Sequence, residues 1–259
     1  MRGERPISNR TQTVLQLALC SWQDWNAGGL GPPASKPEVV TELFGGRTNK
    51  TFLVGCDEFR AVVRVNSPDG LKLGIDRQRE KRILELLQPT GLVPKIFAIH
   101  NDFLVSEFIE GSSLTDNSLK SSHILGSLAA ALELVQSVKM PGAGARNYLD
   151  YCQQYLNQLS EVTVSPLVVK QIEEAARTVD AESWQPVICH HDMVPENIIV
   201  NDRGLFIIDW EYAALGHPGL DFLRLYGADY AATGSQKESL QALFKVKQAM
   251  DKLWLAVQL

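Results

Sequence analysis

A polar loop near residue 190 carries the side chains best suited to chemistry. Asp192 and Asn197 lie in this loop, and an apolar run at 198–200 follows it directly. After a turn, a second apolar run at 205–208 ends in Asp209. Two short apolar runs around a turn predict a β-hairpin, so the loop enters one strand and the other strand ends in a carboxylate. This arrangement predicts that Asp192, Asn197 and Asp209 meet at one point.

Transfer of a phosphoryl group to a hydroxyl group requires these residue types. A carboxylate must orient the attacking hydroxyl and accept its proton, while hard oxygen ligands hold Mg²⁺ against the phosphates. Asp192 suits the first role, and Asn197 and Asp209 suit the second. The residues therefore predict a magnesium-dependent phosphoryl transfer, with Asp192 as the catalytic residue and Asn197 and Asp209 as the metal ligands.

The same region resembles the kinase-like family of aminoglycoside phosphotransferases, choline and ethanolamine kinases and bacterial thiamine kinases. The family's catalytic loop, H-x-D-x-x-x-x-N, is matched by His190, Asp192 and Asn197. Its metal-binding strand ends in I-D-[WF]-E, matched by 208–211, and its later G-x-D-[FL] segment is matched at Asp221. The resemblance implies ATP as the phosphate donor, Mg²⁺ as the metal, and structural support from His190 and Asp221.

The first part of the chain resembles the nucleotide-binding lobe of this family. Residues 44–51 resemble the G-G-x-T-N-K loop of choline-kinase-like members, whose glycines let backbone N–H groups approach phosphate. Arg64 takes the place of the phosphate-contacting base, and Glu80 in the following helix is its implied ion-pair partner. Residues 105–111 resemble the hinge, whose backbone groups would bind the adenine edge. The resemblance thus assigns nucleotide binding to Gly45, Gly46, Thr48, Asn49, Arg64, Glu80, Glu107, Phe108 and Ile109.

Several side chains around this centre have alternative interpretations. His190 is expected to be a hydrogen-bonded core histidine rather than a catalytic acid or base, and His191 is expected to be partly exposed. A metal site built from His190, His191 and Asp192 is disfavoured, because adjacent residues of an extended chain point in opposite directions. Glu211 is either a surface acid or a ligand of a second metal or of a cationic substrate. Trp210 either packs in the core or lines a pocket.

The elements that must position these residues change in type along the chain. Up to residue 110, the periodicity predicts helices at 11–25 and 75–87 and strands at 38–44, 51–54, 59–65, 95–99 and 103–108. Beyond it, helices are predicted at 121–138, 146–160, 165–180 and 236–257, with short strands at 186–189, 198–200 and 205–208. The switch predicts an N-terminal lobe, 1–110, with a five-stranded antiparallel sheet, and a mainly helical C-terminal lobe, 111–259. Together with the resemblance, it gives an α+β fold class, a two-lobed protein-kinase-like fold.

The composition fits an enzyme with a small substrate. The chain has 259 residues, 45% of them hydrophobic and 21% charged. Its net charge of −5 gives no basic footprint, so nucleic acid is not expected as a partner. The four cysteines are far apart and lack C-x-x-C pairs, which indicates reduced thiols. No run approaches the roughly 18 apolar residues of a membrane span, so a cytoplasmic enzyme without membrane insertion is expected.

The leading hypothesis is a kinase for a small cationic alcohol such as thiamine, choline or ethanolamine. The loop at 44–51 and the sequence at 209–212 look more like the choline and thiamine kinase branch than like antibiotic-modifying enzymes. A cationic acceptor would fit an acidic pocket, for which the candidates are Glu196, Glu211, Asp221 and Asp229. An aminoglycoside phosphotransferase is the alternative within the enzyme class. A non-catalytic, pseudokinase-like nucleotide-binding module is the alternative from another class, and the retention of all three central residues argues against it.

Overall fold

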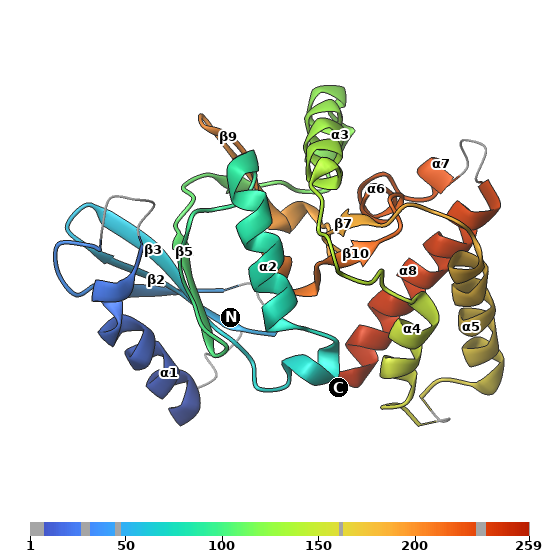
Figure 1. Ribbon diagram of the computed structural model, residues 1–259, viewed down its shortest axis with the longest axis horizontal. Coiled ribbons are helices and arrows are strands. Elements are labelled where there is room, and N and C mark those ends of the chain that lie inside the picture. The colour runs from blue at the N-terminus through green and yellow to red at the C-terminus, as the bar shows by residue number, and fades with distance from the viewer. Residues whose placement is uncertain (1–7, 27–31, 45–47, 161–162, 232–236, 259) are drawn as a thin grey trace. The chain divides into compact units, whose positions relative to one another are not determined.

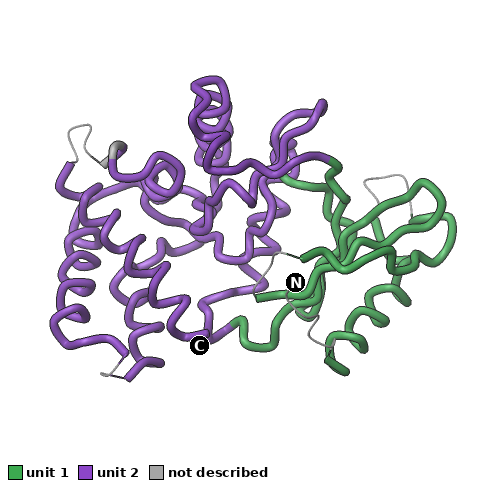
Figure 2. The backbone as a smooth tube through the Cα atoms, turned by 180° about the vertical axis from the view of Figure 1, so that it is seen from behind, with its two compact units in different colours: residues 1–70, 93–110 green, residues 71–92, 111–259 purple. Residues whose placement is uncertain are grey.

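The chain forms two compact units. The computed structural model describes residues 8–26, 32–44, 48–160, 163–231 and 237–258. Unit 1 consists of residues 1–70 and 93–110, and unit 2 of residues 71–92 and 111–259 (Figure 2). The boundary at residue 110 coincides with the predicted change from strands to helices. The units differ from the predicted lobes in the segment 71–92, which the sequence interpretation placed with the N-terminal lobe.

Helix α2 (Arg77–Leu87) is the main element of this segment, and its contacts explain the difference. The helix packs against the 3-10 helix η6 (Trp210–Tyr212) and strand β10 (Ala214–Gly216), both in unit 2. Arg79 Nε also donates a hydrogen bond of 2.8 Å to the carbonyl oxygen of Ala213. These contacts are far apart in sequence, so the periodicity of α2 alone does not reveal them.

Unit 1 is built on an antiparallel sheet of five strands in the order β1-β2-β3-β5-β4. The strands are β1 (Glu38–Leu43), β2 (Lys50–Cys56), β3 (Phe59–Val65), β4 (Ile96–Ile99) and β5 (Phe103–Glu107). Buried residues alternate along the central strands, as Ala61, Val63 and Val65 do in β3, because successive side chains point to opposite faces. The predicted five-stranded antiparallel sheet is confirmed.

Helix α1 (Asn9–Cys20) packs against β3 and β5 (Figure 1). Its apolar face joins the inward-facing side of the sheet in one core, to which α1 contributes Val14, Leu15, Ala18 and Leu19. The helix begins after Ser8, whose hydroxyl accepts a hydrogen bond from the backbone N–H of Thr11. It ends earlier than predicted, because the short 3-10 helix η1 (Trp22–Asp24) replaces its expected last turn.

Unit 2 has a helical core. Besides α2, it contains the helices α3 (Ser122–Ser137), α4 (Tyr148–Leu156), α5 (Pro166–Ala181) and α8 (Lys237–Val257). Helices α4, α5 and α8 pack against one another (Figure 1). Each presents buried residues three or four positions apart, the pattern of a helix with one apolar face. The shared core includes Tyr148, Cys152, Tyr155, Ile172, Ala176, Val179, Leu243, Val246, Met250 and Leu253.

Two small antiparallel sheets of unit 2 carry the polar loop. One pairs β7 (Val187–Cys189) with β10, and the other has the order β6-β8-β9. The strands of the second sheet are β6 (Ser112–Ser113), β8 (Ile198–Asn201) and β9 (Gly204–Ile207). The loop from His190 to Asn197 therefore connects the end of β7 in one sheet to the start of β8 in the other. The predicted hairpin is present, with Ile198 opposite Ile207.

The remaining elements are short. They are the 3-10 helices η2 (Gly70–Leu73), η3 (Gln88–Thr90), η4 (Ser118–Lys120) and η5 (Pro195–Asn197) and the helices α6 (Leu220–Tyr226) and α7 (Ala228–Ala231). Strands β6 and β10 and helices α6 and α7 were not predicted, because such short runs show too little periodicity. Among the helices of the described residues, none is both long enough and apolar enough to cross a membrane.

Candidate active site

The backbone of the polar loop is fixed by Asp221 of α6. Its carboxylate accepts hydrogen bonds from the backbone N–H of His190 at 2.6 Å and of His191 at 3.1 Å. Burial raises the pKa of Asp221 above its ordinary value, while His190, the two backbone N–H groups and Arg224 act in the opposite direction. His191 has a φ of 67°, in the left-handed region that a residue with a side chain rarely adopts. The two bonds to Asp221 stabilise the turn that this conformation produces.

His190 connects the loop to the strand that precedes Asp209. Its Nε2 lies 2.9 Å from the carbonyl oxygen of Ile208, and its Nδ1 lies 3.3 Å from the backbone nitrogen of Asp192. A carbonyl oxygen can only accept and a backbone N–H can only donate. His190 Nε2 is therefore the donor in the first contact, and its Nδ1 is the acceptor in the second. This fully buried histidine agrees with the expected hydrogen-bonded core residue.

Asn197 lies beside Asp192 and is oriented by it. The side-chain Nδ2 of Asn197 donates to the carbonyl oxygen of Asp192 at 3.0 Å and lies 3.4 Å from its Oδ2. Since the amide nitrogen faces Asp192, the amide oxygen of Asn197 faces away from it. The Asp192 side chain itself is 39% exposed, so it is accessible to a substrate.

Asp209 is joined to the same loop through the backbone of Ile208. The N–H of Ile208 donates to the carbonyl oxygen of Asn197 at 2.9 Å, and its carbonyl oxygen bonds to His190. The next residue, Asp209, has φ 64° and ψ 57°, which turns the chain sharply at the end of β9. The structure thus ties the three residues predicted to form the centre to one short stretch of paired backbone.

The donor set of this stretch fits magnesium. The amide oxygen of Asn197 and the carboxylate of Asp209 are hard oxygen ligands, and Mg²⁺ in phosphoryl-transfer sites takes few protein ligands besides phosphates and waters. In the described parts of the chain, no group of three or more His, Cys, Asp or Glu side chains forms a metal site of its own. A magnesium ion held by Asn197 and Asp209 would take its remaining ligands from phosphates and water.

Glu211 does not lie on the surface, so the interpretation as a surface acid is wrong. Its side chain is 2% exposed, and its Oε2 lies 3.1 Å from Arg77 Nη1. The same Arg77 nitrogen lies 2.8 Å from Oε2 of Glu80, so one guanidinium holds two buried carboxylates. Trp210 belongs to the core: it is buried, and its indole Nε1 donates to the carbonyl oxygen of Ile207 at 2.9 Å.

His191 corrects a second expectation. The sequence interpretation made it partly exposed, but the structure buries it to 4% exposure between loop and helix α4. Its Nδ1 lies 3.2 Å from the carbonyl oxygen of Cys189, and its ring meets the edge of Tyr151. Burial and the nearby Arg146 hold the pKa of His191 well below its ordinary value. The inward direction follows from the left-handed backbone, which an extended-chain argument does not anticipate.

The residues assigned to nucleotide binding divide between the two units. Gly45 and Gly46 lie outside the described residues. In unit 1, the side-chain oxygen of Asn49 accepts from the backbone N–H of Ser67 at 3.0 Å, and Thr48 precedes it. Glu107, Phe108 and Ile109 lie at the end of β5 and just beyond. Glu80 lies in unit 2, on α2.

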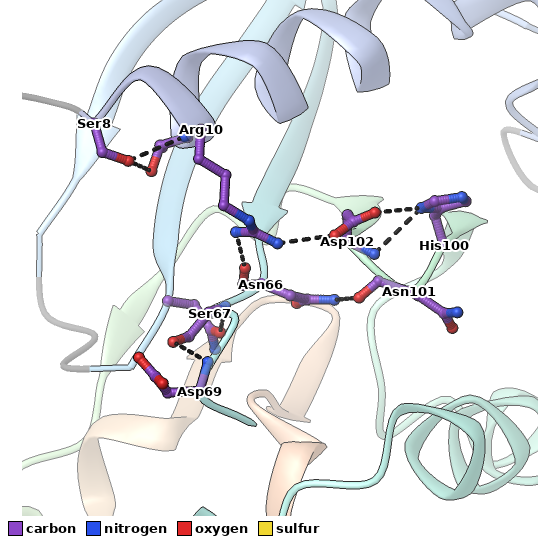
Figure 3. A network of polar contacts seen from close by, with 10 residues as sticks. Ser8, Arg10, Asn66, Ser67, Asp69, His100, Asn101 and Asp102 are labelled. Carbon is purple, nitrogen blue, oxygen red and sulfur yellow. Dashed lines mark hydrogen bonds and ion pairs between the residues drawn. The ribbon is translucent and has the colours of Figure 1, made fainter. Parts of the chain in front are cut away.

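Arg64 belongs to a polar network of unit 1. It is buried on β3, and its Nε donates to Oδ1 of Asn66 at 3.1 Å. Asn66 in turn donates through Nδ2 to the carbonyl oxygen of Asn101, and its own carbonyl oxygen accepts from Arg10 (Figure 3). Arg10 also pairs with Asp102 at 2.8 Å. The network orients the Arg64 side chain, and the sequence patterns gave no sign of it.

The sequence of this chain is similar to that of known phosphotransferases. The model of the phosphotransferase enzyme family, APH, matches residues 39–253. The chain belongs to this family. This family member is 26% identical to ethanolamine kinase 2 of Mus musculus over 208 residues, which are 73% of this chain and 53% of the relative. It is 23% identical to probable choline kinase 2 of Arabidopsis thaliana over 246 residues, 86% of this chain and 67% of the relative. The chain thus spans little more than half of the first of these relatives.

Solved structures show the fold of this family member. Ethanolamine kinase of Plasmodium vivax superposes with a TM-score of 0.74 at 18% identity, over 97% of this chain and 83% of the other. LicA in complex with AMP gives 0.68 at 23% identity, over 95% and 88%. A thermostable mutant of an aminoglycoside phosphotransferase gives 0.63 at 14% identity, over 86% and 88%. The predicted α+β, protein-kinase-like fold and the predicted family are confirmed.

Proposed function

We propose that this chain transfers the γ-phosphoryl group of ATP to a hydroxyl group of a small cationic alcohol. The observation that carries the proposal is the paired geometry of Asp192 and Asn197, with a partly exposed carboxylate beside an amide oxygen that faces away from it. Membership of the phosphotransferase enzyme family supports the reaction class. LicA, a structural neighbour, is known with bound AMP, which supports an adenine nucleotide as the donor.

In this proposal, Asp192 acts on the acceptor. Its carboxylate accepts a hydrogen bond from the attacking hydroxyl, orients the oxygen lone pair and receives the proton as the new O–P bond forms. Asn197 Oδ1 and Asp209 hold Mg²⁺, which when bound neutralises phosphate charge. His190 and Asp221 support the loop, because Asp221 fixes the backbone just before Asp192 and His190 joins it to Ile208. In this proposal Glu211 holds Arg77 in place and does not itself bind the substrate or a second metal.

The nucleotide would be held mainly by unit 1. Gly45, Gly46, Thr48 and Asn49 supply phosphate contacts, and Arg64 supplies the cation, with Glu80 as its partner when nucleotide is bound. The backbone N–H of Glu107 already donates to the carbonyl oxygen of Lys95 at 2.8 Å. The adenine edge is therefore assigned mainly to the backbone of Phe108 and Ile109.

The acceptor is assigned from the relatives rather than from an acidic pocket. Asp221 and Glu211 are buried in internal contacts, so they do not line a pocket as expected, while Glu196 is exposed. Arg224 lies next to Asp192, Asp251 pairs with Arg224, and Lys247 pairs with Asp251, so the charges of these four side chains balance. Ethanolamine and choline are the favoured acceptors because the similar relatives are an ethanolamine kinase and a probable choline kinase. Thiamine is the third candidate.

We propose that the reaction takes place in the cytoplasm. All four cysteines are free thiols, although Cys20 is exposed, which suits a reducing compartment. The small alcohol is the proposed partner, and the net charge of −5 gives no basic footprint that would favour nucleic acid.

The test is an acceptor panel with product analysis. The protein is incubated with Mg²⁺, ATP and ethanolamine, choline, thiamine or an aminoglycoside, and the products are identified by mass. The proposal expects a phosphorylated ethanolamine or choline together with ADP. Phosphorylation of the aminoglycoside alone would change the acceptor class. Binding of Mg-ATP without any phosphorylated product would support a non-catalytic nucleotide-binding module.

A further inference from the structure

Arg224 of α6 lies next to the side chain of Asp192. Its Nη1 is 3.6 Å from Asp192 Oδ1, and its side chain is only 10% exposed. The sequence patterns gave it no role. A guanidinium this close to the proposed catalytic carboxylate must affect the position of that carboxylate, because two opposite charges attract strongly where water is partly excluded.

Helix α6 acts on the loop through two neighbouring residues. Asp221 and Arg224 are three positions apart, which places them on one side of the helix. Asp221 binds the backbone N–H groups of the two residues before Asp192. Arg224 reaches the carboxylate of Asp192 itself. One helix therefore contacts both the backbone and the side chain of the same loop.

Arg224 is held from its other side by helix α8. Its Nη2 lies 3.0 Å from Asp251 Oδ1, and Lys247 Nζ lies 3.0 Å from Asp251 Oδ2. The Arg224–Asp251 pair is at hydrogen-bond distance, whereas the Arg224–Asp192 pair is longer. The guanidinium is thus anchored on α8 and attracts Asp192 without closing a short hydrogen bond to it.

Within the described parts of the chain, each carboxylate oxygen of Asp192 has one weak partner. Oδ1 faces Arg224 at 3.6 Å, and Oδ2 faces Asn197 Nδ2 at 3.4 Å. Two partners on opposite oxygens restrain the rotation of the carboxylate. Because neither contact is short, the lone pairs of both oxygens stay accessible to a hydroxyl.

The environment of Arg224 is not optimised for stability alone. Its Nε is buried and, among the described residues, has no hydrogen-bond partner. A buried donor without a partner costs stability, and such groups often mark functional positions.

We propose that Arg224, anchored by Asp251, is a positioning residue that orients the carboxylate of Asp192 toward the acceptor hydroxyl. The inference rests on the proposed function. Its effect is on the step after binding, since a fixed carboxylate meets the hydroxyl in one orientation. Asp251 contributes through Arg224 and not through the substrate.

The kinetic test compares Arg224→Met, Arg224→Lys and Asp251→Asn with the parent. Arg224→Met is expected to lower kcat about 10- to 100-fold, with KM for ATP within about twofold of the parent. Arg224→Lys retains the charge and should recover part of the loss. The double variant with Arg224→Met and Asp251→Asn should be no slower than Arg224→Met alone. Both changes break the same series of contacts, from Asp251 through Arg224 to Asp192. Arg177→Met, which breaks an exposed pair with Glu173 on α5, is the matched control and should match the parent.

A purely structural role gives a different pattern. It would lower the melting temperature of Arg224→Met while leaving kcat per folded molecule unchanged, and that result would overturn the proposal. Additive losses in the double variant would overturn the link through Asp251. Crystal structures of the parent and of Arg224→Met provide a readout independent of turnover. The proposal expects the Asp192 carboxylate to change its side-chain conformation or to become disordered in the variant, and an unchanged Asp192 would contradict it even if no acceptor were phosphorylated.

Discussion

The side-chain amide of Asn197 donates a 3.0 Å hydrogen bond to the main-chain carbonyl of Asp192 and thereby joins the end of the loop to Asp192. This bond spans five positions of the chain and turns the amide oxygen of Asn197 away from Asp192. The orientation of the proposed metal ligand is thus a consequence of a contact with the proposed catalytic residue.

Replacing Asn197 by Asp tests this relationship. The change substitutes a carboxylate oxygen for the donor and leaves it facing the carbonyl oxygen of Asp192, with a cost of about 1–3 kcal/mol. We expect Mg-nucleotide to bind about 5- to 100-fold more weakly, as measured by calorimetry. Asn201→Asp is the matched control, because Asn201 Oδ1 only accepts, from the backbone N–H of Arg203 at 2.9 Å. Parent-like affinity in Asn197→Asp would refute the assigned orientation.

Replacing Asp209 by Ala tests the metal site. The change removes a proposed carboxylate ligand from the end of β9, so it should weaken magnesium-dependent nucleotide binding at least about tenfold and lower turnover as well. Titration of nucleotide binding with Mg²⁺ measures the effect, with EDTA as the metal-free limit. Asp202→Ala, in the exposed turn between β8 and β9, is the control. If Asp209→Ala kept the magnesium dependence of the parent, Asp209 would not be a ligand.

The spacing of the central residues made much of the site predictable. Asp192, Asn197 and Asp209 lie within one loop and one hairpin, so local sequence predicts the backbone pairing that brings the segments carrying them side by side. The five-stranded sheet and the long helices also follow from local periodicity. The sequence does not reveal Arg224 and Asp251, because their contacts with the loop join segments far apart in the chain.

The errors have a common physical origin. His191 was expected to be partly exposed because it occupies the variable position of the H-x-D motif, but its positive φ, stabilised by Asp221, directs it inward. Glu211 allowed a surface interpretation because its partner Arg77 lies on a helix that is distant in sequence. In both cases a tertiary contact decides the direction of a polar side chain.

Replacing Arg64 by Ala tests the nucleotide site of unit 1. The loss of a charged phosphate contact, together with its bond to Asn66, should weaken ATP binding about 10- to 100-fold. Fluorescence titration with an ATP analogue measures the affinity. Arg60→Ala is the control, because Arg60 lies on the same strand but is exposed and bonds to the carbonyl oxygen of Asp57. Unchanged ATP affinity and turnover in Arg64→Ala would remove Arg64 from the site.

Two buried histidines predict how stability depends on pH. Burial lowers the pKa of His217 from 6.5 to about 4, a shift that corresponds to about 3 kcal/mol when fully titrated. The pKa of His191 is lowered in the same direction. The unfolded chain therefore binds more protons than the folded chain between pH 6.5 and about 4, so the free energy of unfolding falls as the pH falls through this range. The raised pKa of Asp221 opposes this trend, because the folded chain binds this proton at a higher pH than the unfolded chain does.

Urea unfolding at a series of pH values measures this dependence. His217→Gln should flatten the curve between pH 6.5 and about 4 relative to the parent. His123→Gln, which changes an exposed histidine at the start of α3, should leave the slope unchanged. Equal slopes in the parent and His217→Gln would show that His217 is not the source.

Replacing Asp192 by Asn tests the central claim most directly. The change keeps the size of the side chain and removes the base, so the formation rate of the phosphorylated alcohol should fall about 10²–10⁴-fold. The affinity for Mg-nucleotide should stay within about twofold, because Asp192 acts on the acceptor. The decisive measurement is the initial rate of phosphorylated product, by mass, for parent and Asp192→Asn at equal nucleotide saturation. We predict that the parent phosphorylates ethanolamine or choline and that the variant does so only at the reduced rate. A variant that reacts at near the parent rate would contradict the mechanism.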